Sequence, residues 1–238
     1  GASDQGEPTP TARPRFSMPI NQLAIDQRPY ILLTPTANRE VLLSVVSTLI
    51  DSVSMDYELQ YSSGDREEAA IGELQLTAFP STKTILLGSQ SGGGKISYHE
   101  EVSGGSLVTT FYDENYKLSN EWTYITDQPQ ARMFTSRDEK FTVEFTRPYS
   151  GRYIIIFQNP GFPLQPEGEI VSGMYTFAGV APVLGLDVEV TMFGGLTPTG
   201  AKMLGWDGSS WVELSTVTTP QNELVYSGPM FDGFVIVQ

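Results

Sequence analysis

The stretch RYIIIFQ, residues 152–158, indicates the fold, because its apolar side chains do not alternate with polar ones. A strand with one face in water alternates apolar and polar residues, so a continuous apolar run indicates a strand buried on both faces. Just before it, KFTVEFTR (140–147) alternates and places its apolar residues on a single face. Pro148 and Gly151 separate the two segments, which predicts an antiparallel hairpin between them in the centre of a sheet.

Alternating segments of the same kind recur at roughly 10-residue spacing on both sides of this pair, with Gly, Pro, Asp or Asn between them. They are YELQYS (57–62), GELQLTAF (72–79), KISYHEEV (95–102), SLVTTFYD (106–113), LDVEVTMF (186–193) and NELVYSG (222–228). Two stacked sheets satisfy both patterns better than a closed barrel does. We therefore predict an all-β protein, an antiparallel β-sandwich or jelly roll with at most one or two short helices.

Glycine-containing pairs predict two further hairpins. Val102 to Leu107 is expected to turn through Gly104-Gly105, and Leu204 to Val212 through Asp207-Gly208, a pair suited to a tight type I′ turn. Two flexible loops are also expected, at SSGDREEAAIG (62–72) and GSQSGGGK (88–95).

Residues 38–53, NREVLLSVVSTLIDSV, are the one strong candidate for a helix. At helical spacing their polar and apolar side chains fall on separate arcs, and Asn38 can act as the N-cap. Six β-branched residues between Val41 and Val53 suit a buried pair of strands equally well.

The first sixteen residues differ in composition from the rest of the chain. Residues 1–16 contain three prolines and no apolar periodicity, which predicts an extended arm, and Arg13 and Arg15 are its only cations. Because the body behind the arm is acidic, we expect the arm to contact an acidic surface of its own or a neighbouring subunit; a solvated tail is the alternative. Residues 17–238 form the predicted β-sandwich body; the alternative is two β subdomains that divide near 103–106.

The net charge of −14, from 28 acidic and 14 basic residues, limits the partners that the protein can bind. Residues 51–75 carry seven acids and one Arg, and residues 153–238 carry eight acids and one Lys. Nucleic-acid surfaces need clustered Lys and Arg, so direct contact with nucleic acid is not expected. The longest apolar runs are far shorter than the ~20 residues of a spanning helix, so no membrane insertion is expected either.

The sequence lacks the residues that most kinds of enzyme catalysis need. The chain has no cysteine and one histidine, His99, which leaves thiol chemistry and zinc, iron or copper sites without their usual groups. His99 stands beside Glu100 and Glu101 in an alternating segment, which favours a surface histidine over the base of a Ser-His-acid triad. Segment 88–95 departs from the phosphate-loop pattern. We therefore expect no enzyme, no catalytic residues, no metal and no cofactor.

Aromatic residues provide the remaining candidate site. Trp122 with Tyr124, and Trp206 with Trp211 around the Asp207-Gly208 turn, could form platforms on which sugars stack. The alternative is packing, because cross-strand aromatic pairs stabilise hairpins by ~0.2–1 kcal/mol without any ligand.

The segment GAKMLGWDGSSWVEL, residues 200–214, resembles the W-D-G-x-x-W hairpins of phage and other virion structural proteins. With its Pro-rich arm, many short strands, Gly-rich loops and lack of cysteine, the whole chain resembles the β-sandwich coat, cement or spike proteins of icosahedral viruses. The resemblance implies a virion location and assembly with copies of itself or other shell proteins. Arg13 and Arg15 are the only cations of the arm. This low positive charge favours an outer-shell, cement or protruding role over contact with the genome.

The sequence therefore supports two hypotheses of different class. The first is a non-enzymatic virion structural protein, a coat, cement or protruding subunit that acts through protein–protein contacts. The second is a carbohydrate- or receptor-binding β-sandwich module or spike that recognises a host-surface glycan or receptor through the aromatic residues.

Overall fold

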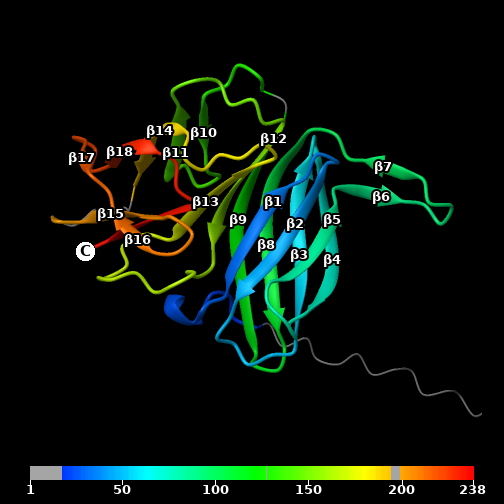
Figure 1. The fold of residues 1–238 in the computed structure, drawn as a ribbon. Coiled ribbons are helices and arrows are strands. Elements are labelled where there is room, and N and C mark those ends of the chain that lie inside the picture. The colour runs from blue at the N-terminus through cyan, green and yellow to red at the C-terminus, as the bar shows by residue number, and fades with distance from the viewer. Residues whose placement is uncertain (1–17, 127, 194–198) are drawn as a thin grey trace, which may run out of the picture.

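The computed structural model describes residues 18–126, 128–193 and 199–238. Within these ranges the regular structure consists of nineteen strands and a single 3-10 turn at Ile25–Gln27. All pairings between these strands are antiparallel. The predicted all-β class is confirmed (Figure 1).

One large sheet runs through the whole body in the order β16-β15-β19-β13-β12-β9-β8-β3-β4. Its strands are β3 (Ser54–Ser63), β4 (Arg66–Gln75), β8 (Val102–Phe111), β9 (Tyr116–Thr126), β12 (Tyr153–Asn159), β13 (Met174–Gly179), β15 (Lys202–Trp206), β16 (Trp211–Glu213) and β19 (Gly233–Val237).

Three smaller sheets accompany it. One has the order β1-β2-β5, with β1 (Tyr30–Pro35), β2 (Glu40–Ser47) and β5 (Ser81–Leu86). Another has the order β10-β11-β14-β18-β17, with β10 (Met133–Thr135), β11 (Phe141–Phe145), β14 (Asp187–Met192), β18 (Leu224–Pro229) and β17 (Thr216–Thr218). The last is a two-stranded hairpin of β6 (Gly88–Gln90) and β7 (Ile96–Tyr98).

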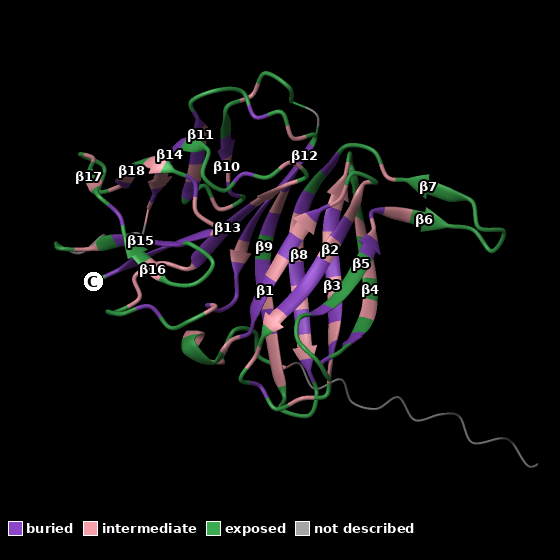
Figure 2. Cartoon of the chain, in the orientation of Figure 1, coloured by how far each residue is buried: buried purple, intermediate pink, exposed green. Residues whose placement is uncertain are grey.

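Strand β12 is buried on both faces, as RYIIIFQ predicts (Figure 2). Successive side chains of a strand point to opposite faces of its sheet. Ile155 packs in a hydrophobic cluster with the core residues of β1, β2 and β5, whereas its neighbours Ile154 and Ile156 pack in a second cluster with those of β11, β14 and β18. The three-stranded and five-stranded sheets therefore cover opposite faces of the large sheet, and β12 belongs to both layers of packing.

The predicted hairpin between residues 140–147 and 152–158 is wrong. β11 pairs with β10 and β14, while β12 pairs with β9 and β13. The two segments instead lie in different sheets and share the second hydrophobic cluster. The reason is that an alternating strand has one apolar face and suits an outer layer, whereas a strand apolar on both faces suits the middle layer. The chain crosses between these layers at Tyr149, whose ring stacks on that of Phe145 with centroids 5.2 Å apart.

The predicted helix over residues 38–53 is also wrong, because residues 40–47 form β2. Its alternate residues Val41, Leu43 and Val45 are fully buried against the large sheet, so the strand period prevails over the helical arc. Asn38 is not a helix cap but lies in the turn that joins β1 to β2.

Other turn predictions have mixed outcomes. The hairpin at Asp207-Gly208 is confirmed, since β15 pairs with β16 and Trp206 lies opposite Trp211. Gly104-Gly105 is not a turn but lies inside β8, where the backbones of β9 and β3 approach too closely to leave room for a Cβ atom. The expected loops are wrong in part: residues 62–72 belong largely to the β3–β4 hairpin, and residues 88–95 begin with β6.

The arm residues Arg13 and Arg15 lie outside the described residues. Residues 103–106, near which two subdomains could divide, lie within the continuous strand β8. In the part of the chain that the structure describes, no helix has both the length and the apolar character needed to span a membrane.

Candidate functional site

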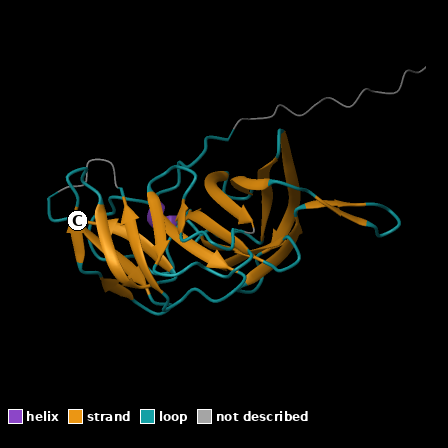
Figure 3. Ribbon diagram, turned by 90° about the horizontal axis from the view of Figure 1, so that it is seen from above, coloured by secondary structure: helices purple, strands orange, loops and turns teal. Residues whose placement is uncertain are grey.

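The β6–β7 hairpin, residues 88–98, projects from the body of the protein (Figures 1 and 3). Its two strands pair only with each other, and residues 89–98 are all exposed. Two of the exposed side chains are large and apolar or aromatic, Ile96 at 42% and Tyr98 at 39%. An isolated two-stranded hairpin is marginally stable in water, so this segment depends on contacts at its base or with another molecule.

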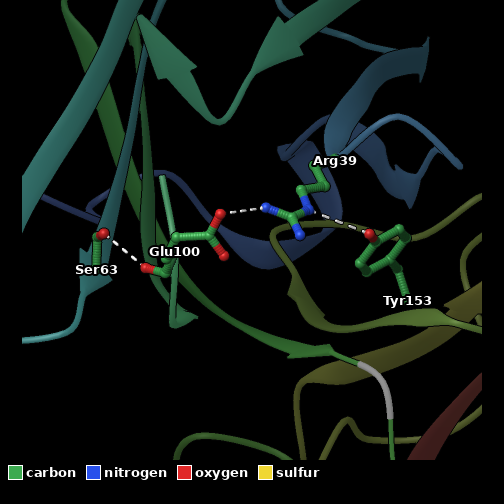
Figure 4. A network of polar contacts seen from close by, with 4 residues as sticks. All are labelled: Arg39, Ser63, Glu100 and Tyr153. Carbon is green, nitrogen blue, oxygen red and sulfur yellow. Dashed lines mark hydrogen bonds and ion pairs between the residues drawn. The ribbon is translucent and has the colours of Figure 1, made fainter. Parts of the chain in front are cut away.

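A polar clamp fixes the base of this hairpin (Figure 4). Arg39 Nη1 donates to Glu100 Oε1 at 2.7 Å, and Arg39 Nε donates to the Tyr153 hydroxyl at 3.3 Å. From the other side, Ser63 Oγ donates to the backbone carbonyl of Glu100 at 2.7 Å. The clamp therefore joins the β1–β2 turn, the end of β3, the segment after β7 and the start of β12.

The turn conformation of Arg39 places its side chain in the clamp. Its φ of +56° lies in the left-handed region, which non-glycine residues adopt mainly in turns. The hydrogen bonds to Glu100 and Tyr153 raise the pKa of the guanidinium. Arg39 is thus a permanent positive charge at the base of the hairpin.

His99 also contributes to the base. Its Nδ1 lies 3.1 Å from the hydroxyl of Tyr61, and its backbone N–H donates to the carbonyl of Leu87 at 3.0 Å. Among the hydrogen bonds of the described residues, none links the His99 ring to a serine or a carboxylate. The hydrogen bonds of His99 are those of a hairpin anchor and differ from the Ser-His-acid chain of a triad.

A small cavity of about 110 Å³ lies beside the clamp, lined among others by Arg39, His99, Tyr124, Arg152 and Tyr153. The ring of Tyr124 stacks on that of Tyr153, with centroids 5.8 Å apart and planes at 16°. Burial raises the pKa of Tyr124, opposed by the nearby charges of Arg39 and Arg152. The cavity thus combines buried phenols with two arginines and two glutamates, Glu100 and Glu101.

The first predicted sugar platform, Trp122 with Tyr124, is wrong. Trp122 is 1% exposed, packs in the first hydrophobic cluster and donates from Nε1 to the carbonyl of Gln60 at 3.1 Å. Both residues point from β9 into the core beneath the three-stranded sheet, so their ring faces cannot meet a glycan.

The second predicted platform stays a prediction at Trp211 alone. Trp206 is buried, but Trp211 is only partly buried and packs edge-on against it, with centroids 5.3 Å apart. Trp211 Nε1 donates to the carbonyl of Leu164 at 2.7 Å. Trp211 lines a cavity of about 380 Å³. Lys202 and Glu213 line the same cavity and form an ion pair, with 2.8 Å between Lys202 Nζ and Glu213 Oε2.

No cluster of three or more histidine or carboxylate side chains suited to a metal ion occurs within the described ranges. Comparison with known proteins finds no matching family model, no similar curated protein and no similar solved structure. Sequence analysis missed the residues of the clamp, because Arg39 fell within the supposed helix. Only the tendency of asparagine, here Asn38, to occupy turns could have indicated that Arg39 lies in a turn.

Proposed function

We propose that the protein is a non-enzymatic structural subunit of a virion or a similar assembly, and that the β6–β7 hairpin contacts a neighbouring subunit. The observation that carries the proposal is a clamped hairpin that projects from the body with Ile96 and Tyr98 exposed. Burying such side chains against a partner removes apolar surface from water and supports a hairpin that is weak on its own.

The clamp at the base supports the same proposal. The carbonyl and carboxylate of Glu100 are held from different sides, by Ser63 and Arg39 respectively. A hairpin held in this way leaves the body in one direction, which lowers the ordering cost of docking it on a partner. The non-enzymatic part rests on the residues at the base, where His99 is engaged with Tyr61.

The test is the substitution Ile96→Asp, which places a charge on the exposed apolar position of the hairpin. Because Ile96 is exposed, the substitution should leave the melting temperature of the subunit unchanged. We expect association, measured by sedimentation velocity over a range of concentrations, to weaken by at least tenfold. Val217→Asp is the matched control, because Val217 is exposed on β17.

Two outcomes contradict the proposal. If the wild-type protein stays monomeric at all concentrations, it is not an assembly subunit. If Ile96→Asp and Val217→Asp associate as the wild type does, the hairpin is not the contact.

A second candidate function, glycan binding, is favoured by the cavity at Trp211. A partly exposed indole beside charged and amide side chains, here Lys202, Glu213 and Gln165, is a common composition for a ligand site. We expect the wild-type protein to bind a subset of a glycan array, Trp211→Phe to retain binding and Trp211→Ala to lose it. Tyr112→Ala is the control, since Tyr112 is exposed outside this cavity. Absence of wild-type binding contradicts this candidate.

A further inference from the structure

The hydroxyl of Tyr124 is a buried polar group without a partner, and Tyr124 lines the cavity beside the clamp. The residue is only 4% exposed, and its hydroxyl oxygen is shielded from solvent without a hydrogen bond. Buried hydroxyls nearly always have a partner, because leaving one unpaired is unfavourable. The cavity is the place from which a partner can come.

Further donors surround the same space. The Tyr153 hydroxyl accepts from Arg39 Nε, so its own hydrogen remains for donation. Arg39 uses Nε and Nη1 in the clamp, and its Nη2 takes no part in it. The two nearly parallel phenols and the Arg39 guanidinium thus form a wall of hydrogen-bond donors.

Arg152 adds a second positive charge to this wall. Its guanidinium carbon lies 5.3 Å from the centre of the Tyr153 ring. The ion pairs of the described residues involve Arg39, Arg132 and Lys202, so Arg152 has no carboxylate partner there. The cavity therefore carries a cation that no acid of the described chain neutralises by direct contact.

Two carboxylates, those of Glu100 and Glu101, also line the cavity. Glu100 is held in the clamp. Glu101 points its Oε2 at the β3–β4 turn, 3.1 Å from the place that a Cβ on Gly64 would take. The Nδ1 of His99 is engaged with Tyr61. On the side of Tyr153, the Tyr124 hydroxyl and the Arg152 guanidinium line the cavity, and both can donate to an anionic acceptor.

We propose that this cavity binds a carboxylate group, whose oxygens accept hydrogen bonds from Tyr124 and Tyr153 while Arg152 balances the charge. Arginine suits carboxylates because its planar fork can donate two parallel hydrogen bonds. The volume of about 110 Å³ is well below that of sites for drug-sized ligands, so the cavity holds one small group of a few atoms.

The carboxylate has two possible sources, a free small carboxylic acid or an acidic side chain of a second copy of this chain. The binding chemistry is the same for both. The site stands independently of the hairpin contact, because Ile96 does not line the cavity.

The experiment is a titration of the protein, labelled with ¹³C at the ζ carbon of its 11 tyrosines, with sodium acetate. Acetamide, a neutral molecule of similar shape, and sodium chloride are the matched controls. We expect acetate alone to shift the signals of Tyr124 and Tyr153 in a saturable way, and to raise the melting temperature as ligand binding to the folded state requires.

Two variants locate the site. Arg152→Gln should weaken acetate binding at least tenfold, whereas Arg137→Gln, at an exposed arginine that does not line the cavity, should bind as the wild type does. Tyr124→Phe should also lose affinity, yet melt at the same or a higher temperature without acetate, because it removes an unpaired buried hydroxyl. That last measurement separates loss of the site from loss of the fold.

The proposal is overturned if acetate gives no saturable shift at Tyr124 and Tyr153, if acetamide or chloride gives the same shift, or if Arg152→Gln binds as tightly as the wild type. Sedimentation in saturating acetate distinguishes the sources. Weakened self-association means that a second copy supplies the carboxylate, and unchanged association means that a free acid does. Neither result depends on the outcome for Ile96→Asp.

Discussion

Asn159 hydrogen-bonds both backbone polar groups of Ile31, although the two residues are 128 positions apart in the chain. The Asn159 Nδ2 donates to the carbonyl of Ile31, and the N–H of Ile31 donates to Asn159 Oδ1 at 3.1 Å. Both residues are buried. The side-chain amide thereby pairs with β1 as a neighbouring strand would, and it ties the three-stranded sheet to the end of β12.

We predict that Asn159→Leu destabilises the protein severely. The leucine fills a similar volume but leaves a buried N–H and a buried C=O of Ile31 unpaired, which should cost about 2–5 kcal/mol of unfolding free energy. Urea denaturation measures this cost. The control is Asn38→Leu at an exposed turn position, and equal midpoints for the two variants would show that the link is dispensable.

The second prediction concerns the double burial of β12. Ile155 and Ile156 are almost fully buried in different hydrophobic clusters, so Ile155→Ala and Ile156→Ala should each cost about 2–5 kcal/mol, from lost transfer energy and a cavity. Glu144→Gln, on the polar face of β11, should cost little. Thermal melts compare the three variants, and equal tolerance would mean that β12 is not central.

The local periodicity of the sequence predicts strands and their burial, but not their partners. RYIIIFQ predicts a strand buried on both faces because its side chains from Tyr153 to Phe157 are apolar without interruption, and the structure confirms this. The same periodicity cannot distinguish a hairpin from a crossover between layers, since both bury the apolar face of β11. The helix error over 38–53 arose because Val41, Leu43 and Val45 fit a strand face while the whole segment also fits a helical arc.

The candidate site was the less predictable part. Arg39, Glu100, Tyr124 and Tyr153 come from different strands and turns, and only the sheet topology brings them together. The aromatic residues were visible in the sequence, but their burial was not. Trp122 lies beneath a sheet formed by residues much earlier in the chain, so spacing along β9 alone could not reveal its cover.

The third prediction concerns the only histidine. His99→Ala removes a hydrogen bond to Tyr61 at the base of the hairpin, and a single partly exposed bond contributes about 0.5–1.5 kcal/mol. We expect a small loss of thermal stability and unchanged self-association. A hydrolytic activity that is present in the wild type and absent from a folded His99→Ala protein would contradict the non-enzymatic proposal.

The fourth prediction concerns residues 1–16, whose cations Arg13 and Arg15 precede an acidic body. Deleting this segment should leave the melting temperature of the body unchanged and weaken self-association. The difference from the full chain should shrink at high salt, because screening weakens attraction between charges on different subunits. Sedimentation velocity at low and high salt measures the self-association of both proteins. Association of the truncated protein equal to that of the full chain at every salt concentration would make the segment a passive tail.

The last prediction concerns the acid stability of the β15–β16 turn. The Asp207 carboxylate accepts hydrogen bonds from the backbone N–H groups of Ser209 and Ser210, each at 2.8 Å, and these lower the pKa of Asp207 from 3.8 to about 2. Because the pKa is lower in the folded than in the unfolded state, the turn is stabilised above the ordinary pKa of an aspartate, and this stabilisation is lost as the pH falls from about 4 to about 2. The carboxyl ¹³C shift of Asp207 should therefore titrate near pH 2, and the difference in melting temperature between the wild type and Asp207→Ala should shrink over the same range. An Asp207 that titrates near pH 4, with a difference in melting temperature independent of pH, would show that the carboxylate does not hold the turn.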